Sequence, residues 1–407
     1  MLYFKHIDFA KKFHVSLRTV HNWIEAAALG KLELDLHTEG GKTYVANTAK
    51  NLALIATLTE SRRKFRNTKA NKTISPKPEF YTVFNERQIH DIATNLEIHQ
   101  EIPRQYNYFN GGADHWDAYA EKLVKEDVPN LINSTIRLLA SSQGYIDDLL
   151  ANYKRVNIID IGVGNAYPVK NLLTHLLTQK KLSRYIALDI SPNILNIAQN
   201  NIEHWFGDKV AFEAHELDIN YDRFSDLLIS EYSRKDAAET VNLVLLLGGT
   251  LSNMRTPDAG YKIIHDSMGI RDILIHTTKL DTEATRSYFD FNLNPGETRL
   301  AAIHSLVVDL LNIEKSFYDV EMGYDAIHKQ RFERIRLNVA LSIKIKFKNG
   351  EHTVDLNKGD TILTWRGLQQ AADDVYHQLA RNDFYLLHSS QTANQEYILT
   401  ASCIKHG

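Results

Sequence analysis

The sequence predicts an α/β protein whose main domain is a doubly wound, mostly parallel sheet. Short apolar runs typical of buried strands alternate with longer amphipathic segments, and the first of these runs leads into a glycine-containing turn. The 407 residues, 43% of them apolar and 24% charged, suffice for one large core and a smaller one. We therefore expect two or three domains.

The segment from Val156 to Asn165 carries the clearest signal. Its apolar positions suit a strand that is covered on both faces. Asp160 precedes Gly162 and Gly164, and glycines let the backbone approach a ligand closely. This order predicts a nucleotide-like cofactor at the carboxyl end of the strand.

Charge divides the chain unevenly. Residues 1–75 hold 13 Lys plus Arg against 6 Asp plus Glu, a net +7, and the remainder holds 34 against 44, a net −10. A basic segment beside an acidic body is typical of a part that faces a polyanion.

The single cysteine, Cys403, excludes an intrachain disulfide and a multi-cysteine metal site. Without a basic leader or an apolar run of about 18 residues, we expect a cytoplasmic protein without membrane contact.

The first 60 residues predict two helices and a hairpin. Helical spacing covers Ile7 to Phe13, and Ser16 suits the N-cap of a helix from Leu17 to Leu29. The run Glu39-Gly40-Gly41-Lys42 provides a hairpin turn. This pattern resembles a winged helix-turn-helix of the MerR and excisionase type.

That resemblance implies contacts with DNA. The side chains suited to phosphates and base edges are Arg18, Thr19, Asn22 and Lys42. Small helical domains also serve as protein-contact or dimerisation modules, so a structural role and a dimer both stay open. Residues 61–78 are rich in Lys and Arg, end in Ser-Pro-Lys-Pro, and have the composition of a basic linker.

From Pro78 to about Leu150 the pattern is mostly helical, with one interruption. The stretch from Gln105 to Trp116 combines aromatic residues with two adjacent glycines. Aromatic rings beside flexible backbone, just before a nucleotide-type core, can form a lid over a ligand. A packed loop with core aromatics is the alternative.

The central segment alternates strands and helices. Strands are predicted at Val156–Ile161, Tyr185–Ile190, Val210–Phe212, Val241–Leu247 and Ile273–His276, and helices at Val169–Leu177, Ile194–Trp205 and Tyr261–Met268. A dinucleotide fingerprint requires a third glycine where this chain has Tyr167, which weakens a hydride-transfer function.

The acidic residues favour S-adenosyl-L-methionine instead. The order Asp160-x-Gly162-x-Gly164, with Asp189 ending the second strand, is a common arrangement for this cofactor. In it the glycine turn approaches the amino-acid part of the cofactor and Asp189 accepts hydrogen bonds from the ribose hydroxyls. Asp218, after the third strand, is placed to meet the adenine.

Successive motifs also resemble one family in their order. They are Ile159 to Gly164, Ile186 to Ser191, Leu217-Asp218, and Leu247 to Asn253. From about Pro103 onward, the chain resembles the histidine-specific methyltransferases, whose best-known member trimethylates the α-amine of histidine in the ergothioneine pathway. The resemblance implies an enzyme with a class I, Rossmann-like methyltransferase fold and S-adenosyl-L-methionine as methyl donor.

The resemblance implies roles for further residues. Tyr108 and Gly111 match the tyrosine-rich lid of the family, and Gly248 belongs to the motif after the fourth strand, so all three are expected to bind the cofactor. Asn253 matches the asparagine that holds the substrate carboxylate, and Tyr288 lies near the amine-facing tyrosine. Both are expected to contact the substrate and to act in catalysis. For Asn253, a cap on the following helix is the alternative.

One departure from the family concerns the substrate. Where the family has Leu-Thr-Glu-x-Ser, which grips the imidazole, this chain reads Leu363-Thr364-Trp365-Arg366-Gly367. We therefore expect Trp365 to contact an acceptor other than histidine: a small amine, an amino acid-like molecule or a peptide. A DNA-binding regulator that senses S-adenosylmethionine or another ligand without turnover is the alternative.

The C-terminal third predicts an antiparallel α+β cap for substrate recognition. A helix is expected from Arg299 to Ile313 and a hairpin around Asn349-Gly350, after the alternation from Ile335 to Phe347. Strands at Asp383–Leu387 and Tyr397–Cys403 would surround a helix from Leu368 to Leu379.

Two further expectations complete the prediction. Four residues are spaced for one helical face: Glu321, Tyr324, His328 and Arg331. The 18 histidines form no cluster with zinc-ligand spacing, so no metal is predicted. The predicted domains are residues 1–60, the linker 61–78, the cofactor-binding core with its helical lid 79–295, and the cap 296–407.

Overall fold

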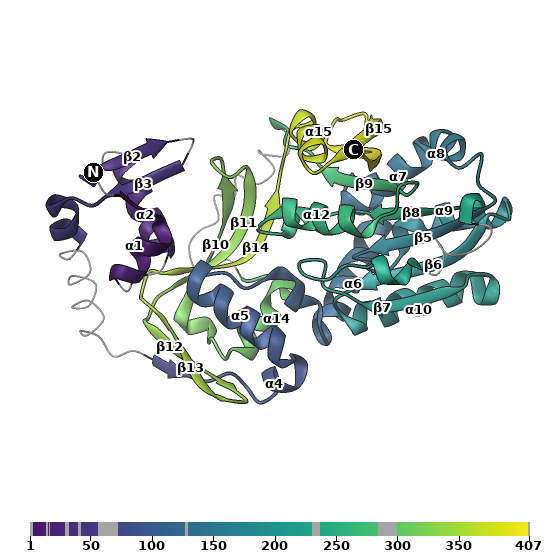
Figure 1. The fold of residues 1–407 in the computed structure, drawn as a ribbon. Helices are drawn as coiled ribbons and strands as arrows, with labels where there is room; N and C mark the ends of the chain where they lie inside the picture. The colour runs from purple at the N-terminus through teal and green to yellow at the C-terminus, as the bar shows by residue number, and fades with distance from the viewer. Residues whose placement is uncertain are drawn as a thin grey trace. The chain divides into compact units, whose positions relative to one another are not determined.

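The computed structural model describes residues 3–13, 15, 17–28, 32–39, 42–55, 72–126, 129–229, 237–283 and 299–405. The chain divides into two compact units (Figure 1). The first comprises residues 1–102, 310–319 and 336–362, and the second comprises residues 103–309, 320–335 and 363–407. The first unit therefore takes in two segments of the C-terminal third.

A seven-stranded sheet forms the centre of the second unit. Its order is β15-β16-β9-β8-β5-β6-β7. These strands are β5 (Arg155–Ile161), β6 (Leu182–Asp189), β7 (Phe212–Glu216), β8 (Thr240–Leu246), β9 (Ile273–Lys279), β15 (Phe384–Gln391) and β16 (Tyr397–Ile404). The strands from β5 to β9 are parallel, whereas β16 runs antiparallel to β9 and to β15. The predicted doubly wound parallel core is confirmed.

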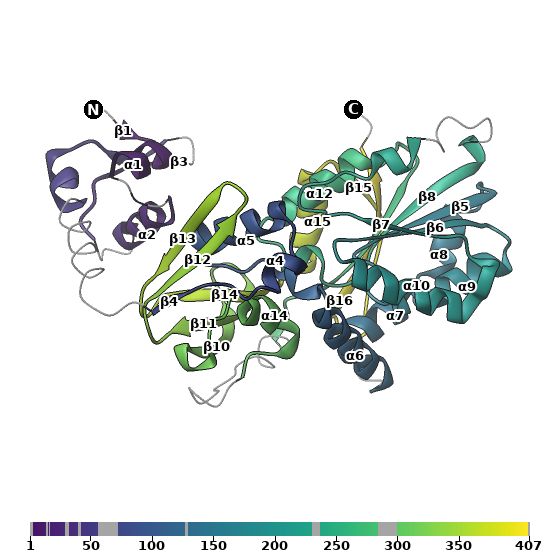
Figure 2. The ribbon, with the colours of Figure 1, turned by 90° about the horizontal axis from the view of Figure 1, so that it is seen from below.

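Helices cover both faces of this sheet. Figure 2 shows α12 (Pro257–Ser267) and α15 (Ala372–Arg381) on one face, with α9 (Lys170–Thr178) and α10 (Pro192–Phe206) on the other. Every residue of β8 is buried, as the near-continuous apolar run predicts for a strand covered twice. Inside such a sheet a polar group needs a partner, and Asn157 donates to Asn242 at 2.9 Å.

The last two strands correct the predicted cap. The sequence pattern assigns Asp383–Leu387 and Tyr397–Cys403 to the cap, but the corresponding β15 and β16 belong to the central sheet. Ile398 to Ala401 are fully buried. Side-chain alternation shows that a strand is buried without showing which sheet buries it, so the sequence could not make this assignment.

Four helical elements precede β5 in the second unit, in agreement with the prediction. They are the 3-10 helix η1 (Arg104–Tyr108) and the α-helices α6 (Gly111–Lys125), α7 (Leu131–Ser141) and α8 (Gln143–Leu149). Asn130 caps α7 by accepting from the backbone N–H of Asn133 at 2.9 Å.

A three-stranded sheet corrects a second prediction. It contains β10 (Tyr318–Asp325), β11 (Gln330–Leu337) and β14 (Thr361–Leu368) in the order β10-β11-β14. The helical face predicted from Glu321 to Arg331 is therefore wrong, because these residues lie in two strands and the turn between them. In β11 every second residue is buried, and two of these buried residues, Arg331 and Glu333, are charged. Charged residues on the inner face conceal the alternation that normally reveals a strand.

The hairpin in the first unit is confirmed. β12 (Leu341–Phe347) and β13 (Gly350–Leu356) pair antiparallel, with Phe347 opposite Gly350, and β4 (Lys72–Ile74) pairs parallel with β12. The same unit holds α4 (Phe80–Val83) and α5 (Glu86–His99), which begins with a capping box at Asn85. The alternation predicted from Ile335 to Phe347 spans two strands of different sheets, the end of β11 and all of β12.

The N-terminal residues form the predicted helices and hairpin. These are α1 (His6–Phe13), α2 (Leu17–Ala28), β2 (Leu36–Glu39) and β3 (Lys42–Ala46), with β1 (Tyr3–Phe4) also paired to β3. Asn22 is exposed, Thr19 is buried, and the side chains of Arg18 and Lys42 lie outside the described residues. Contact with DNA therefore stays a prediction.

Within the described part of the chain, no helix combines the length and the apolar character that a membrane crossing requires.

Candidate active site

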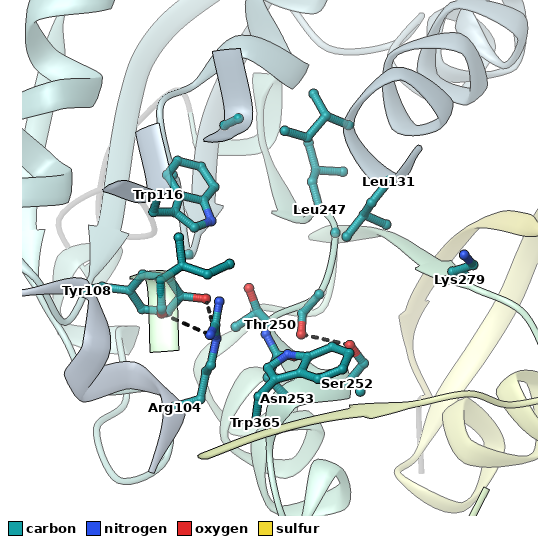
Figure 3. Close-up of a pocket in the computed structure, with 18 of the residues that line it drawn as sticks. Arg104, Tyr108, Trp116, Leu131, Leu247, Thr250, Ser252, Asn253, Lys279 and Trp365 are labelled. Atoms are coloured by element: carbon teal, nitrogen blue, oxygen red, sulfur yellow. Dashed lines mark hydrogen bonds between the residues drawn. The ribbon is translucent and has the colours of Figure 1, made fainter. Parts of the chain in front are cut away.

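A cavity of about 960 Å³ lies at the carboxyl ends of the parallel strands in the second unit (Figure 3). It is lined by the segments after β5, β6, β7 and β8, by η1 and α6, and by parts of β11 and β14. Nine predicted site residues line it: Tyr108, Asp160, Gly162, Gly164, Asp189, Asp218, Gly248, Asn253 and Trp365. Gly111 starts α6 and is not part of the described lining, and Tyr288 lies outside the described residues.

The glycine turn after β5 requires both of its glycines. Gly162 and Gly164 have φ angles of +68° and +57°, which disfavour residues with a side chain. A Cβ at Gly162 would lie 2.5 Å from Oγ1 of Thr250, and one at Gly164 would lie 2.5 Å from the ring of Trp116. The turn therefore lets two cavity-lining side chains from distant parts of the chain pack directly on its backbone.

The aromatic segment upstream of the core lies on this turn. Trp116 of α6 meets Tyr108 edge to face, with ring centres 6.4 Å apart. Asn165, beside the turn, donates to Asp117 of α6 at 2.9 Å, and the Ser191 hydroxyl donates to the carbonyl of Tyr108 at 2.6 Å. The segment from Gln105 to Trp116 thus packs on the candidate cofactor site, as a lid requires, and its movement stays a prediction.

Asp160 and Asp189 are carboxylates held in a poorly solvated environment. Asp160 accepts a hydrogen bond from the Tyr185 hydroxyl at 2.8 Å. Burial raises the pKa of Asp160 to about 7, an effect that the Tyr185 hydrogen bond opposes and the charge of Asp189 reinforces. Burial likewise raises the pKa of Asp189 to about 7, opposed by backbone N–H groups that include that of Ser191 and reinforced by the charge of Asp218.

Asp218 organises the segment after β7. One of its carboxylate oxygens accepts from the backbone and the side chain of Asn220, at 3.0 and 2.7 Å. After β8, Gly248 has a φ of +89° and donates its N–H to the Thr277 hydroxyl at 3.0 Å. The four neighbouring strands β5, β6, β7 and β8 therefore end in acidic or glycine residues around one cavity, which fits a ligand with a ribose and an amino-acid part.

The other end of the cavity contains a contact between two predicted substrate residues. The indole Nε1 of Trp365 donates to Oδ1 of Asn253 at 3.1 Å, although the two residues come from β14 and from the turn after β8. The N-cap position of α12 is occupied by Thr256, so Asn253 is not the cap of that helix. The alternative role of Asn253, as the cap of the following helix, is therefore excluded.

Trp365 and Gly367, which stand where the family motif has an acid and a serine, form one structural feature. The indole of Trp365 stacks on the imidazole of His304, with ring centres 5.7 Å apart and planes 8° apart. A Cβ at Gly367 would lie 2.8 Å from this indole. The tryptophan therefore occupies space that a side chain at position 367 would need.

Sequence reasoning missed a buried pair at this end of the cavity. Nδ1 of His304 lies 2.7 Å from Oε1 of Glu333, and both residues line the cavity. Burial raises the pKa of Glu333 to about 7, although the nearby charge of Arg104 opposes the shift. Neither residue stands in a recognisable motif, because they come from α14 (Ala302–Leu310) and β11 and meet only in the folded chain. Among the described residues, no group of three or more His, Cys, Asp or Glu is arranged to hold a metal ion.

In the central sheet, one antiparallel strand, β16, is inserted beside β9, and the glycine turn after β5 opens onto the ligand cavity. This arrangement is the architecture of the class I S-adenosylmethionine-dependent methyltransferases. Sequence comparison narrows this class further. The chain belongs to the family of histidine-specific, S-adenosylmethionine-dependent methyltransferases, whose model matches residues 85–402. It is therefore an enzyme that uses S-adenosyl-L-methionine as its methyl donor.

Solved structures similar to this chain are distant in sequence. An S-adenosylmethionine-dependent methyltransferase from Clostridium acetobutylicum is 11% identical, with 72% of this chain and 99% of that chain covered and a TM-score of 0.40. The CcbJ methyltransferase from Streptomyces caelestis is 11% identical, with 72% and 98% covered and a TM-score of 0.37. The magnesium protoporphyrin IX methyltransferase from Synechocystis is 11% identical, with 74% and 98% covered and a TM-score of 0.36. Among curated proteins, none matches the chain.

We expect cofactor affinity to fall as the solution becomes acidic. With a pKa of about 7, Asp189 is mostly ionised at about pH 8 and mostly protonated at about pH 6. The ribose hydroxyls that Asp189 is predicted to meet would donate hydrogen bonds to its ionised form, so the Kd of S-adenosylhomocysteine should rise about tenfold across this range. Calorimetric titrations at several pH values measure it.

The control for this experiment is Asp189→Asn, which keeps the side-chain shape but cannot ionise. Its Kd should vary much less with pH, because Asp160 and Glu333 are then the remaining cavity-lining acids whose pKa is raised to about 7. An equally steep pH dependence in the variant would assign the effect to those two acids. A flat wild-type profile would contradict the prediction.

Proposed function

We propose that this enzyme methylates the nitrogen of a small amine, an amino acid-like molecule or a peptide other than histidine. The observation that carries the proposal is the arrangement of Trp365: its indole is bonded to Asn253 and covers Gly367. The acid and serine that grip an imidazole in the family are thereby replaced by an aromatic surface. An acceptor with an apolar or aromatic part suits such a surface.

The proposed cofactor contacts follow the strand ends. Bound S-adenosylmethionine supplies an electrophilic methyl group. Asp189 would accept from its ribose hydroxyls, Asp218 would meet its adenine, and the turn at Gly162 and Gly164 would adjoin its amino-acid part. Tyr108 and Gly248, which also line the cavity, would complete the cofactor-binding site together with Gly111 of the lid segment.

Asn253 would position the acceptor through its amide nitrogen. An indole N–H can only donate, so the contact with Trp365 fixes Oδ1 of Asn253 toward the indole and leaves Nδ2 to donate. A carboxylate or carbonyl of the acceptor is the fitting partner for Nδ2. The role proposed for Tyr288 is to orient the amine lone pair.

Methylation requires an amine that has lost its proton. The Glu333 carboxylate, with its pKa raised to about 7 and its contact with His304, is suited to accept a proton near neutral pH. The remaining contribution of the chain is positioning and the exclusion of water, which dominate for an in-line transfer to a neutral nitrogen.

Mass spectrometry tests this function directly. The full-length protein is incubated with S-adenosylmethionine and a panel of amines, amino acids and peptides. We expect S-adenosylhomocysteine and a product heavier by one methyl group with at least one acceptor, and neither with free histidine. Asn253→Ala should lose most of the product while cofactor binding, measured by calorimetry, is kept. The absence of S-adenosylhomocysteine above the blank with every acceptor would refute the proposal.

We propose that residues 1–60 tether the enzyme to DNA or to a partner protein. The net charge of +7 over residues 1–75 and the exposed Asn22 on α2 support this role. Fluorescence anisotropy with a DNA duplex, for wild type and for Arg18→Ala, measures the contact. If no acceptor is ever methylated but the cofactor changes DNA affinity, a regulator that senses the cofactor replaces the enzyme. If DNA does not bind at low salt, the tether contacts protein.

A further inference from the structure

A buried histidine–carboxylate pair lies at the Trp365 end of the cavity. His304 of α14 and Glu333 of β11 both belong to the second unit, and 2.7 Å separates Nδ1 of the imidazole from Oε1 of the carboxylate. A neutral histidine beside an ionised carboxylate carries its proton on the nitrogen that faces the carboxylate and donates it there. The contact therefore leaves Nε2, on the opposite edge of the ring, with a lone pair.

Access to the cavity differs between the two partners. The His304 side chain is 8% exposed, whereas that of Glu333 is 1% exposed and its Oε2 is sealed from solvent. Nε2 of His304 is not among the sealed polar atoms, and within the described part of the chain it accepts no hydrogen bond. A proton that leaves the methyl acceptor thus reaches this pair through the imidazole and not through the carboxylate.

Trp365 places this imidazole beside the proposed acceptor contact. The two rings are stacked with planes 8° apart, and the same indole donates to Oδ1 of Asn253 at 3.1 Å (Figure 3). Thr364, the residue before it, donates to the backbone carbonyl of Glu333 at 3.0 Å. Adjacent residues of β14 therefore hold the imidazole, the carboxylate and Asn253 in one arrangement before an acceptor arrives.

We propose that His304 is the general base of the reaction: its Nε2 receives a proton from the ammonium form of the methyl acceptor, and Glu333 positions the ring. The N–H bond of the ammonium breaks, its electron pair stays on the nitrogen, and the proton forms a new N–H bond at Nε2. The carboxylate stabilises the resulting imidazolium, which returns the proton to solvent once the product has left. The inference rests on the proposed function, because it names the residue that prepares the amine for methyl transfer.

The pair gains or loses one proton close to neutral pH. Burial raises the pKa of Glu333 to about 7, an effect that the charge of Arg104 opposes. Hydrogen bonds from Ala301 and Thr364 oppose it further. Whether the added proton stays on the carboxyl group or moves to the imidazole, Nε2 then carries hydrogen, because a protonated carboxyl group donates to Nδ1. Nε2 is a base only above the pH at which the pair loses this proton, so the rate of methylation should rise with pH.

Nitrogen NMR on the protein itself provides the first test. The chain is labelled with isotopic histidine and loaded with S-adenosylhomocysteine, and the signals of His304 are assigned by their absence in His304→Phe. Above about pH 8 Nδ1 should carry hydrogen and Nε2 none, and Nε2 should gain hydrogen as the pH falls through about 7. Glu333→Gln lacks the negative charge, so there Nε2 should gain hydrogen only at lower pH. The opposite tautomer at high pH, or an unchanged titration in Glu333→Gln, would overturn the proposal.

Other charged groups lie near the pair. Arg104 donates to the carbonyl of Ile303, Arg331 shares the inner face of β11 with Glu333, and arginine stays charged across this pH range. Burial and the charge of Arg331 lower the pKa of Lys279, which also lines the cavity, to about 8. Because the NMR signals report the ring nitrogens of His304 themselves, titration of these neighbours displaces the curve without replacing it.

The rate of methylation provides the second test, with the acceptor found by mass spectrometry and saturating S-adenosylmethionine. His304→Phe keeps an aromatic ring against Trp365 but has no base, so its kcat/KM at about pH 7.5 should fall about 100-fold. It should then keep rising with pH where the wild type levels off above about pH 8, because the acceptor must lose its proton to solvent. His204→Gln, which removes an exposed histidine outside the cavity lining, is the matched control and should behave as the wild type.

The outcomes separate this inference from the function on which it rests. Glu333→Gln should show a smaller loss of rate than His304→Phe, and it provides the comparison if His304→Phe does not fold. Methylation by His304→Phe at the wild-type rate and with the wild-type pH profile would overturn the inference and leave the methyltransferase function intact. If no acceptor is methylated by the wild type, the proposed function fails and the inference fails with it, even where the NMR titration is as expected.

Discussion

Replacing Asp189 with Ala is expected to remove measurable cofactor binding while the protein stays folded. Asp189 ends β6 and lines the cavity, where the proposed ribose would donate to its carboxylate. The loss of hydrogen bonds to a charged group amounts to about 3 kcal/mol, or a weakening of about 100-fold or more. Isothermal titration calorimetry with S-adenosylhomocysteine measures this directly.

The stability of Asp189→Ala distinguishes lost binding from lost folding. Burial raises the pKa of Asp189 above that of an unfolded chain, so at neutral pH its ionisation opposes folding. The variant should therefore melt no earlier than the wild type in the absence of cofactor. Asp208→Ala, on an exposed carboxylate outside the cavity lining, is the control and should bind cofactor normally. Retained affinity in Asp189→Ala would show that the cofactor lies elsewhere.

Replacing Trp365 with Ala is expected to reduce acceptor use strongly and leave cofactor affinity nearly unchanged. The variant loses the donor to Asn253 and the stack on His304, so Asn253 is no longer held in one orientation. We expect kcat/KM for the acceptor to fall about 100-fold, since a misplaced reacting group costs about this much. Steady-state rates with the acceptor found by mass spectrometry, together with calorimetry for the cofactor, measure both effects.

Two further variants separate the contributions of Trp365. Trp365→Phe keeps an aromatic ring against His304 but lacks the N–H that Asn253 accepts, so it should show an intermediate loss. Gly367→Ala keeps the tryptophan, but its new Cβ would lie 2.8 Å from the indole, so it should displace the ring and resemble Trp365→Ala. Normal acceptor kinetics in both Trp365→Ala and Gly367→Ala would exclude the indole from the acceptor site.

The cofactor half of the site could be predicted from sequence because its residues occupy fixed places relative to strands. A buried parallel strand appears as a local apolar run, and the residue that follows it must lie at the ligand-binding edge of the sheet. Asp160, Asp189 and Asp218 were identified in this way, and all three line the cavity. No long-range information was needed for them.

The acceptor half could not be predicted in this way. Its charged residues Arg331 and Glu333 lie on the inner face of β11, and a sequence pattern treats inward charges as evidence against a strand. His304 and Trp365 meet their partners across long sequence separations, which no local periodicity records. Asn253 and Trp365 were identified only because the motifs around them resemble those of one family.

The position of β16 has a consequence for the synthesis of the protein. β9 is flanked by β8 on one side and by β16 on the other, and Ile273, Leu274 and Ile275 of β9 are buried. A ribosome releases β9 long before the partner segment Tyr397–Ile404, so the nascent chain exposes an apolar strand edge during this interval. A chain terminated between these strands would retain the whole glycine turn and its acidic residues, yet it should aggregate through that edge and not persist as a weakened enzyme.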